Sequence, residues 1–214
     1  MTRASPAVLD GRKVALVVGN GAYQHVERLA QAPKDADLVA VSVRALGFEV
    51  VEDDDVTRDG LRRDIVSAKA RMKGAAVGFF YYSGHGMQID GENYLVPVDA
   101  ALATQDDVPL EAVDVNEVLR AMETSGSQLN VAVLDACRNN PWASSWFSDG
   151  RAVAANRGLA DMAAPAGFLL AFATGPDHVA PDDGSYAQAL VAAMATPGLE
   201  IDRVFRQVYA EVHV

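Results

Sequence analysis

The sequence predicts one α/β domain whose central sheet is mostly parallel and is covered by helices on both faces. Short β-branched runs alternate with amphipathic helical stretches along the 214 residues, which is the pattern of a covered parallel sheet. Half of the residues are hydrophobic and 22% are charged, so the chain can bury a sizeable core. No apolar run approaches the roughly 18 residues that a membrane span needs. We therefore exclude a membrane protein, and disorder over most of the chain.

The first half of the chain predicts three strands and two helices. Gly47 and Gly74 suit the ends of the helices, because glycine readily adopts the left-handed conformation that follows a helix. Thr57 is a suitable N-cap for the second helix, and the almost wholly apolar third strand indicates a central position. We expect strand 13–18, helix 35–46, strand 48–51, an acidic turn at 52–55, a helix from Thr57 to residue 72, and strand 76–82.

The second half predicts a small hairpin after the third strand and then a return to the sheet. Asp90 and Gly91 form a dipeptide typical of a hairpin turn, here between two short strands within residues 87–96. A loop as long as residues 139–157 is usually functional or a processing site in a compact domain. The other expected elements are helix 114–122, strand 129–134, strand 167–173, and helices 185–195 and 201–212.

Two reactive side chains follow buried strands of this sheet. His85 comes after the third strand and Cys137 after the fourth. Functional clefts of open α/β sheets lie beyond the carboxyl ends of the strands, so neighbouring strands would bring imidazole and thiol together, and the imidazole would favour a nucleophilic thiolate. Gly84 and Gly86 would let the backbone approach a substrate. The amides of Gly86 and Cys137 could form an oxyanion hole.

These motifs resemble those of the caspase-like cysteine peptidases. Residues 82–86 (YSGHG) and 135–138 (DACR) carry the resemblance, and Cys137 lies 52 residues after His85, close to the roughly 50 typical of caspases. Stretches VALVVGNGAY at 14–23, YLVPVD at 94–99 and AFATGP at 171–176 support it. The chain looks most similar to bacterial metacaspase-like proteins, the orthocaspases. The resemblance implies a caspase-hemoglobinase fold, endopeptidase activity and a catalytic dyad of His85 and Cys137.

The resemblance also implies that the substrate residue just before the cleaved bond carries a positive charge. Asp135 stands where caspases have glutamine, and it matches an acidic residue that metacaspases and paracaspases use to receive arginine or lysine. Asp35 aligns with a second such residue, whereas a third acidic position of paracaspases falls near Val179. Two carboxylates in a desolvated slot would bind a guanidinium strongly and repel an acidic side chain. We expect cleavage after arginine, with lysine second.

The family's division into two segments gives the expected domain organisation. One peptidase domain spans 1–214, with a larger-subunit-like segment at 1–138, a linker at 139–157 and a smaller-subunit-like segment at 158–214. Relatives continue further, so we expect the C-terminal end to be shortened. Arg151 and Arg157 lie in the linker, and a protease specific for basic residues could cut itself there.

Several other interpretations stay open at this stage. Cys137 alone could be a small buried hydrophobic residue or a redox-sensing thiol, and the whole domain could be a weakly active or inactive interaction module. Asp135 could cap the following turn. Asp35 could be the N-cap of the first helix, and Gly19-Asn20-Gly21 gives a weak hint of a nucleotide loop.

Charge and cysteine content limit the partners and cofactors. Eighteen lysine and arginine residues against 29 aspartate and glutamate residues give a net charge of -11, which opposes binding to nucleic acid and favours basic peptide or protein substrates. One cysteine allows neither a disulfide within the chain nor a multi-cysteine zinc site. We expect no membrane partner, a monomer, and, since residues 1–10 lack a signal-like apolar stretch, a cytoplasmic location.

Acidic pairs and triples raise the question of calcium, on which some metacaspases depend. They lack the alternating ligand spacing of a calcium loop, so solvated charge is the favoured interpretation. We expect no cofactor and no metal. The acidic groups are residues 53–55, 106–107 and 182–183.

Overall fold

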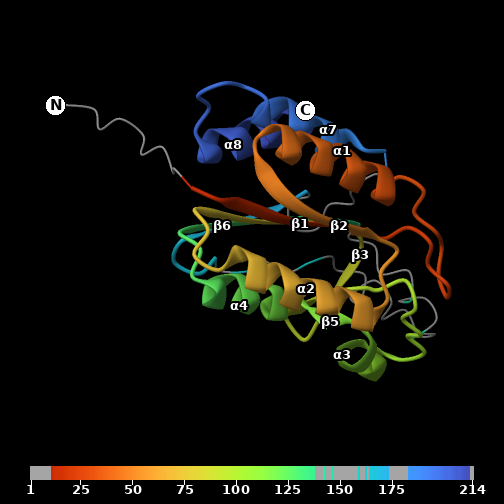
Figure 1. Ribbon diagram of the computed structural model, residues 1–214. Coiled ribbons are helices and arrows are strands. Elements are labelled where there is room, and N and C mark those ends of the chain that lie inside the picture. Colours follow the sequence, from red (N-terminus) through yellow and green to blue (C-terminus); the bar gives the residue numbers. More distant parts are fainter. Residues whose placement is uncertain are drawn as a thin grey trace.

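The computed structural model describes residues 11–137, Trp142, Trp146, Leu159, Met162, residues 164–173 and residues 183–212. Helices cover both faces of a central sheet, with α1, α7 and α8 on one face and α2 and α4 on the other (Figure 1). This confirms the predicted α/β class with a mostly parallel sheet. The elements are β1 (Lys13–Gly19), α1 (Ala32–Ala45), β2 (Phe48–Asp54), α2 (Arg58–Met72), β3 (Val77–Ile89), β4 (Glu92–Leu95), the 3-10 helix η1 (Gln105–Asp107), α3 (Val108–Glu111), β5 (Val113–Asp114), α4 (Val115–Ser125), β6 (Leu129–Cys137), β7 (Phe168–Phe172), α7 (Ser185–Met194) and α8 (Ile201–Val212).

Five strands of the sheet run parallel in the order β2-β1-β3-β6-β7. The third strand is central, as its apolar sequence predicts. Beyond the parallel part, β3 continues and pairs antiparallel with β4, which in turn pairs with β5. The predicted hairpin is therefore built on an extension of β3 itself. Its turn residues Asp90 and Gly91 both have positive φ, 53° and 87°, as a two-residue turn of the I′ type requires.

Alternation along the strands divides the core between the two faces of the sheet. Tyr81 and Val133 pack with α1, α7 and α8, whereas Phe80 and Leu134 pack with α2 and α4. Successive strand residues point to opposite faces, so Asp135 belongs to the same face as Val133 and Tyr81. A third cluster contains Trp142 together with Met87 of β3 and residues of the loops after β1 and β4.

Two strands are longer than their apolar runs predict. The predicted strands end at residues 82 and 134, but β3 runs on to Ile89 and β6 to Cys137. His85 and Cys137 therefore lie within strands rather than after them. Polar and small residues do not end these strands because the two neighbours pair with each other.

Helix α1 and strand β2 also differ from the expected bounds. Helix α1 begins at Ala32, with Gln31 as its N-cap, so the suggestion that Asp35 is the N-cap is wrong. Strand β2 continues through Asp54, and the turn proper is made by Asp55 at φ 53°. Thr57 caps α2 by accepting a hydrogen bond from the Gly60 amide at 3.1 Å, as predicted.

The expected linker at 139–157 lies outside the described residues, except for two tryptophans. Trp142 is buried at 6% exposure, and the Trp146 indole N–H donates to the Leu102 carbonyl at 3.1 Å. Within the described part of the chain, no helix combines the length and apolar character needed to cross a membrane.

Candidate active site

His85 and Cys137 are paired residues on neighbouring parallel strands. The register of β3 and β6 aligns Ser83 with Asp135, Gly84 with Ala136 and His85 with Cys137. Both strands reach this point at their carboxyl ends relative to the parallel sheet, where clefts form in α/β folds. The backbone thus brings the two predicted reactive residues side by side.

His85 is buried, and its ring contacts a backbone carbonyl and a tryptophan ring. Only 5% of the residue is exposed, and its Nε2 lies 3.0 Å from the Glu27 carbonyl oxygen. A carbonyl can only accept, so Nε2 carries the hydrogen and Nδ1 is the basic nitrogen of the neutral ring. The Trp142 ring packs edge-on at 5.9 Å between centroids. The result is an imidazole in one defined tautomer.

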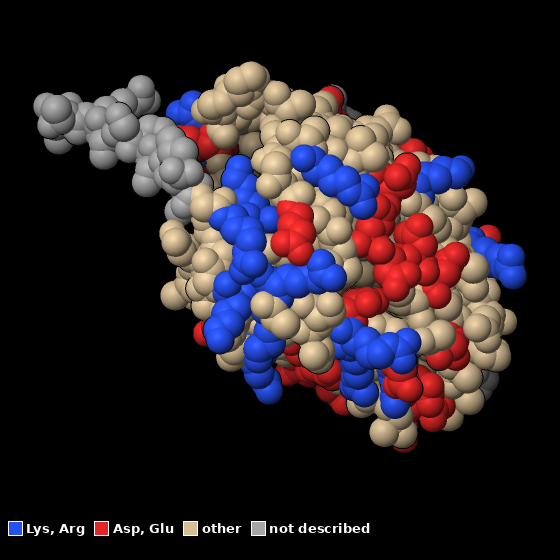
Figure 2. Space-filling view, in the orientation of Figure 1, with Lys and Arg blue, Asp and Glu red and all other residues tan. Residues whose placement is uncertain are grey.

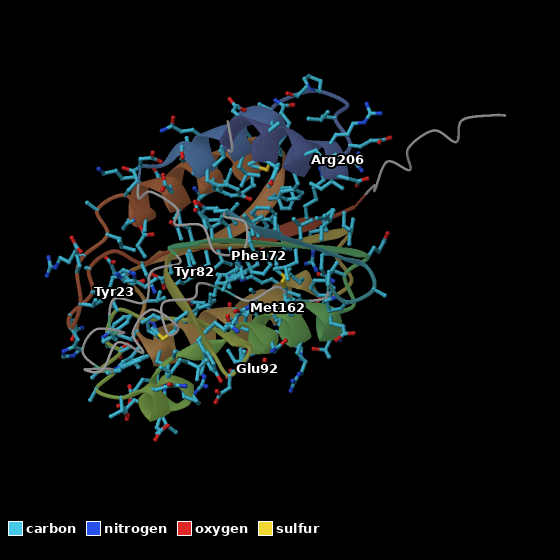
Figure 3. The ribbon with its side chains drawn as sticks, turned by 180° about the vertical axis from the view of Figure 1, so that it is seen from behind. Tyr23, Tyr82, Glu92, Met162, Phe172 and Arg206 are labelled. Atoms are coloured by element: carbon cyan, nitrogen blue, oxygen red, sulfur yellow. The ribbon has the colours of Figure 1, made fainter. Side chains whose placement is uncertain are left out.

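Two tyrosines surround the backbone of this histidine. The Tyr23 hydroxyl accepts the His85 amide at 2.7 Å, and the Tyr82 hydroxyl lies within donating distance of the carbonyls of His85, at 3.0 Å, and Val96, at 2.9 Å. Figure 3 shows Tyr23 and Tyr82 at the same end of the sheet. Neither residue is among the site residues predicted from the sequence, because Tyr82 belongs to a largely apolar strand and Tyr23 lies in the loop between β1 and α1, far from His85 in the sequence.

The flanking glycines make room for protein atoms. A Cβ on Gly84 would lie 2.6 Å from the Tyr23 hydroxyl and 2.8 Å from that of Tyr82, and a Cβ on Gly86 would lie 2.9 Å from that of Ala136. The sequence-based interpretation assigned both glycines to close approach of substrate. The structure shows that packing inside the site leaves no room for a side chain at either position, and the predicted approach of substrate stays a prediction.

Asp135 is half-buried and receives a hydrogen bond from a buried tyrosine. The Tyr81 hydroxyl donates to Asp135 Oδ2 at 2.7 Å. Burial, the charge of Asp135 and this hydrogen bond, and then the charge of Asp35 raise the pKa of Tyr81. Burial and the charge of Asp135 likewise raise the pKa of Tyr186. These hydroxyls therefore stay protonated and can donate to carboxylates.

Asp35 reaches the same region from helix α1. It is buried at 4% exposure, and its Oδ1 accepts a hydrogen bond from Gln31 Nε2 at 2.8 Å. Gly184, which precedes α7, lies against it: a Cβ there would meet Asp35 Oδ1 at 2.8 Å. The fold thus gathers Asp35 and Asp135 around Tyr81, whose pKa both raise. The fold also gives Asp135 a hydrogen-bond partner within the sheet, the Tyr81 hydroxyl. This partner is additional to the role of turn cap that the sequence suggests.

The weak hint of a nucleotide loop at residues 19–21 is wrong. The Asn20 side chain is fully buried and bonds the backbone of Val96 and Val56. The amides of Gly21 and Ala22 donate to Asp55 Oδ1 at 2.8 and 2.7 Å. Because these amides already donate to a carboxylate of the protein, they are not free to bind a phosphate, and the loop has a structural role.

The other acidic groups either form hydrogen bonds with nearby residues or lie close enough to repel one another. Asp107 closes a capping box with Thr104, and Asp183 accepts from the Ser185 amide at 2.9 Å. Burial and the charges of Glu52 and other neighbouring carboxylates raise the pKa of Asp54 to about 6. Figure 2 shows a band of acidic side chains right of centre on one molecular face, with a run of basic side chains to its left and other basic groups around it. No group of three or more potential ligands among the described residues is arranged to hold a metal ion.

Some predicted site residues fall outside the described residues. These are Arg151 and Arg157, the candidates for self-cleavage, and Val179. For Cys137 the structure describes the backbone position in β6. The predicted roles of these residues stay predictions.

Three comparisons with known proteins agree with this architecture. Residues 12–213 match the family model described as the caspase domain. The human mucosa-associated lymphoid tissue lymphoma translocation protein 1 is 31% identical over 126 residues, which cover 59% of this chain and 15% of that protein. Its mouse homolog is 30% identical over the same shares. The match to the crystal structure of the Drosophila initiator caspase Dronc covers 99% of this chain and 80% of the Dronc chain, with a TM-score of 0.68 and 14% sequence identity.

Proposed function

This chain belongs to the caspase-domain family, and on that premise we propose that it is a cysteine endopeptidase that cleaves after basic residues, arginine first and lysine second. The pairing of His85 with Cys137 across β3 and β6 is the observation that carries the proposal. The matched curated relatives are much longer proteins, of which the aligned region is 15%.

In the proposed reaction, His85 takes the proton of the Cys137 thiol, and the thiolate attacks the carbonyl carbon of the bond to be cut. The amides of Gly86 and Cys137 stabilise the oxyanion. His85 then returns the proton to the leaving amine, and water hydrolyses the thioester to release the acid and restore the thiol. The Glu27 carbonyl supports this role, since it directs the hydrogen to Nε2 and leaves Nδ1 as the base.

The proposed preference for a basic side chain is supported by Asp35 and Asp135. Asp135 accepts a hydrogen bond from Tyr81, and Asp35 is buried on α1, which packs on the same face of the sheet as Tyr81. A guanidinium can pair with carboxylates in two parallel hydrogen bonds, which an ammonium cannot match. Arginine should therefore be preferred over lysine, and aspartate should be rejected. This acidic pair is shared by metacaspases and paracaspases, and the proposed closeness to orthocaspases rests instead on the motifs at 82–86 and 135–138.

A panel of fluorogenic peptides tests the proposal. Peptides that differ only in arginine, lysine or aspartate before the reporter are incubated with the wild type and with Cys137→Ala, with and without a calcium chelator. We expect cysteine-dependent release from arginine, less from lysine and none from aspartate, unaffected by the chelator. A folded wild type that releases nothing would favour the interaction module, and release only from aspartate would overturn the roles of Asp35 and Asp135.

We also propose that the enzyme cuts its own linker at Arg151 or Arg157. The support is their position in the segment that joins the larger and smaller parts of the domain. Intact mass spectrometry after incubation should show a cut after one of these arginines in the wild type and none in Cys137→Ala. An uncut wild type that still cleaves peptides would reject self-cleavage and leave the peptidase proposal standing.

A further inference from the structure

The loop between β1 and α1 contacts His85 at its backbone and at its ring. The Tyr23 hydroxyl accepts the His85 amide at 2.7 Å, and the Tyr23 ring lies 4.4 Å from the imidazole between centroids, at an angle of 51°. Four residues later, the Glu27 carbonyl faces His85 Nε2 at 3.0 Å. One loop therefore holds the backbone of the proposed base, packs against its ring and determines its tautomer.

The Tyr23 hydroxyl is itself anchored. It lies 3.2 Å from the Val96 carbonyl, to which it can donate, and 3.4 Å from the Tyr82 hydroxyl. The amide of the next residue, Gln24, donates to the Val98 carbonyl at 2.9 Å. A side chain at position 84 would displace both tyrosine hydroxyls, so Gly84 is needed for this arrangement.

Asp55 anchors the start of the loop from the end of β2. Its Oδ1 accepts the amides of Gly21 and Ala22 at 2.8 and 2.7 Å, and its own amide donates to the Gly19 carbonyl at 2.9 Å. Hydrogen bonds to a carboxylate are roughly twice as strong as neutral ones. Asp55 has φ 53°, in the left-handed region that aspartate and asparagine tolerate better than most residues. The conformation and the charge together suit this position.

We propose that Tyr23 is a positioning residue for His85 and that Asp55 acts through Tyr23 by holding the loop. This inference rests on the proposed peptidase function. The Tyr23 hydroxyl accepts the amide of His85, a buried residue, and its loss would remove an acceptor from that buried N–H. The strand end would then shift, and the ring would lose its register with the Glu27 carbonyl.

Tyr23→Phe tests the first half, because it removes the hydroxyl and keeps the ring. We expect kcat on an arginine peptide to fall about 10-fold, the size expected when one buried N–H loses its partner, with KM within about 2-fold. The acid limb of the pH–rate profile should move, since it reports the base. Tyr209→Phe on α8, where Tyr209 is 62% exposed, is the matched control and should leave all three unchanged.

A second measurement does not depend on activity. The ring-nitrogen NMR signals of His85, assigned with His85→Gln, should report the Nε2–H tautomer in the wild type and a mixture of tautomers in Tyr23→Phe. A wild type with this tautomer but no turnover would contradict the peptidase proposal and retain the positioning role. A folded Tyr23→Phe with wild-type kcat, pH profile and tautomer would overturn it.

Asp55 variants test the second half. Asp55→Ala should lower kcat about 10-fold and produce the same tautomer mixture, whereas Asp55→Asn, which keeps an acceptor oxygen and the left-handed conformation, should stay within about 3-fold of the wild type. Asp53→Ala, two residues away in β2, is the control and should stay within about 2-fold. If Asp55→Ala and Asp53→Ala behave alike, Asp55 does not act through Tyr23.

Discussion

Two groups of carboxylates in this protein differ in what surrounds them. Asp35 and Asp135 come from α1 and β6 to the region of a buried tyrosine, where Asp35 is buried and Asp135 is half-buried. Residues 53–55 follow one another at the end of β2 and are exposed, and partial burial and then the charges of neighbouring carboxylates raise the pKa of Asp54. Carboxylates that the fold gathers from distant elements are candidates for ligand recognition, whereas consecutive ones at a strand end mainly affect stability and loop geometry.

The largest expected effect separates the two groups directly. Asp135→Asn should lower kcat/KM for an arginine peptide about 1000-fold, because a buried charge pair with the substrate is lost. Asp54→Asn should leave kcat/KM within about 2-fold. Steady-state kinetics of both variants provides the test, and comparable losses would mean that the distinction between the two groups is wrong.

Asp35→Asn should have a smaller effect than Asp135→Asn. Asparagine can still accept the Gln31 hydrogen bond, so the helix should keep its structure while the charge is removed. We expect kcat/KM for arginine to fall about 100-fold, mainly through KM, since the contact binds ground and transition states alike. Circular dichroism checks the fold. Unchanged kinetics in a folded variant would remove Asp35 from the specificity pocket.

Tyr81→Phe should have a smaller effect again. The substitution deletes the hydroxyl that donates to Asp135 at 2.7 Å and leaves both carboxylates in place. Loss of one hydrogen bond to a charged group predicts a decrease of about 10-fold in kcat/KM. The ratio of arginine to lysine turnover should also fall, since Asp135 would be less well oriented. A Tyr81→Phe enzyme with the wild-type ratio would show that this hydroxyl does not position Asp135.

The smallest expected effect concerns stability at the end of β2. Burial and neighbouring carboxylates raise the pKa of Asp54 from 3.8 to about 6. The protonated side chain therefore stabilises the folded state fully below about pH 3.8, and this contribution is lost as the pH rises through about 6. Asp54→Asn should therefore raise Tm at about pH 7.5 but not at about pH 4. The gain should be only roughly 1–2 °C because the side chain is exposed and solvent screens it. Calorimetry at the two pH values measures it, and an equal gain at both would exclude titration of Asp54 as the cause.

The sequence by itself determined the fold class, most elements and the two strand ends that carry His85 and Cys137. These features depend on local signals: apolar periodicity, helix caps such as Thr57, and the turn dipeptide at Asp90. The α8 helix was predicted with its observed bounds. The same local signals ended β3 and β6 too early, since pairing between neighbours, not apolar character, extends them.

Only the tertiary structure decided which distant residues meet. It aligned His85 with Cys137, brought Tyr23 and Glu27 to the histidine, and placed Asp35 and Asp135 on one side of the sheet near Tyr81. The physical reason is that strand register and helix packing are set by burial over the whole domain. The sequence around Gly84 does not indicate that the hydroxyls of Tyr23 and Tyr82 pack against it, because these hydroxyls reach Gly84 only in the folded sheet.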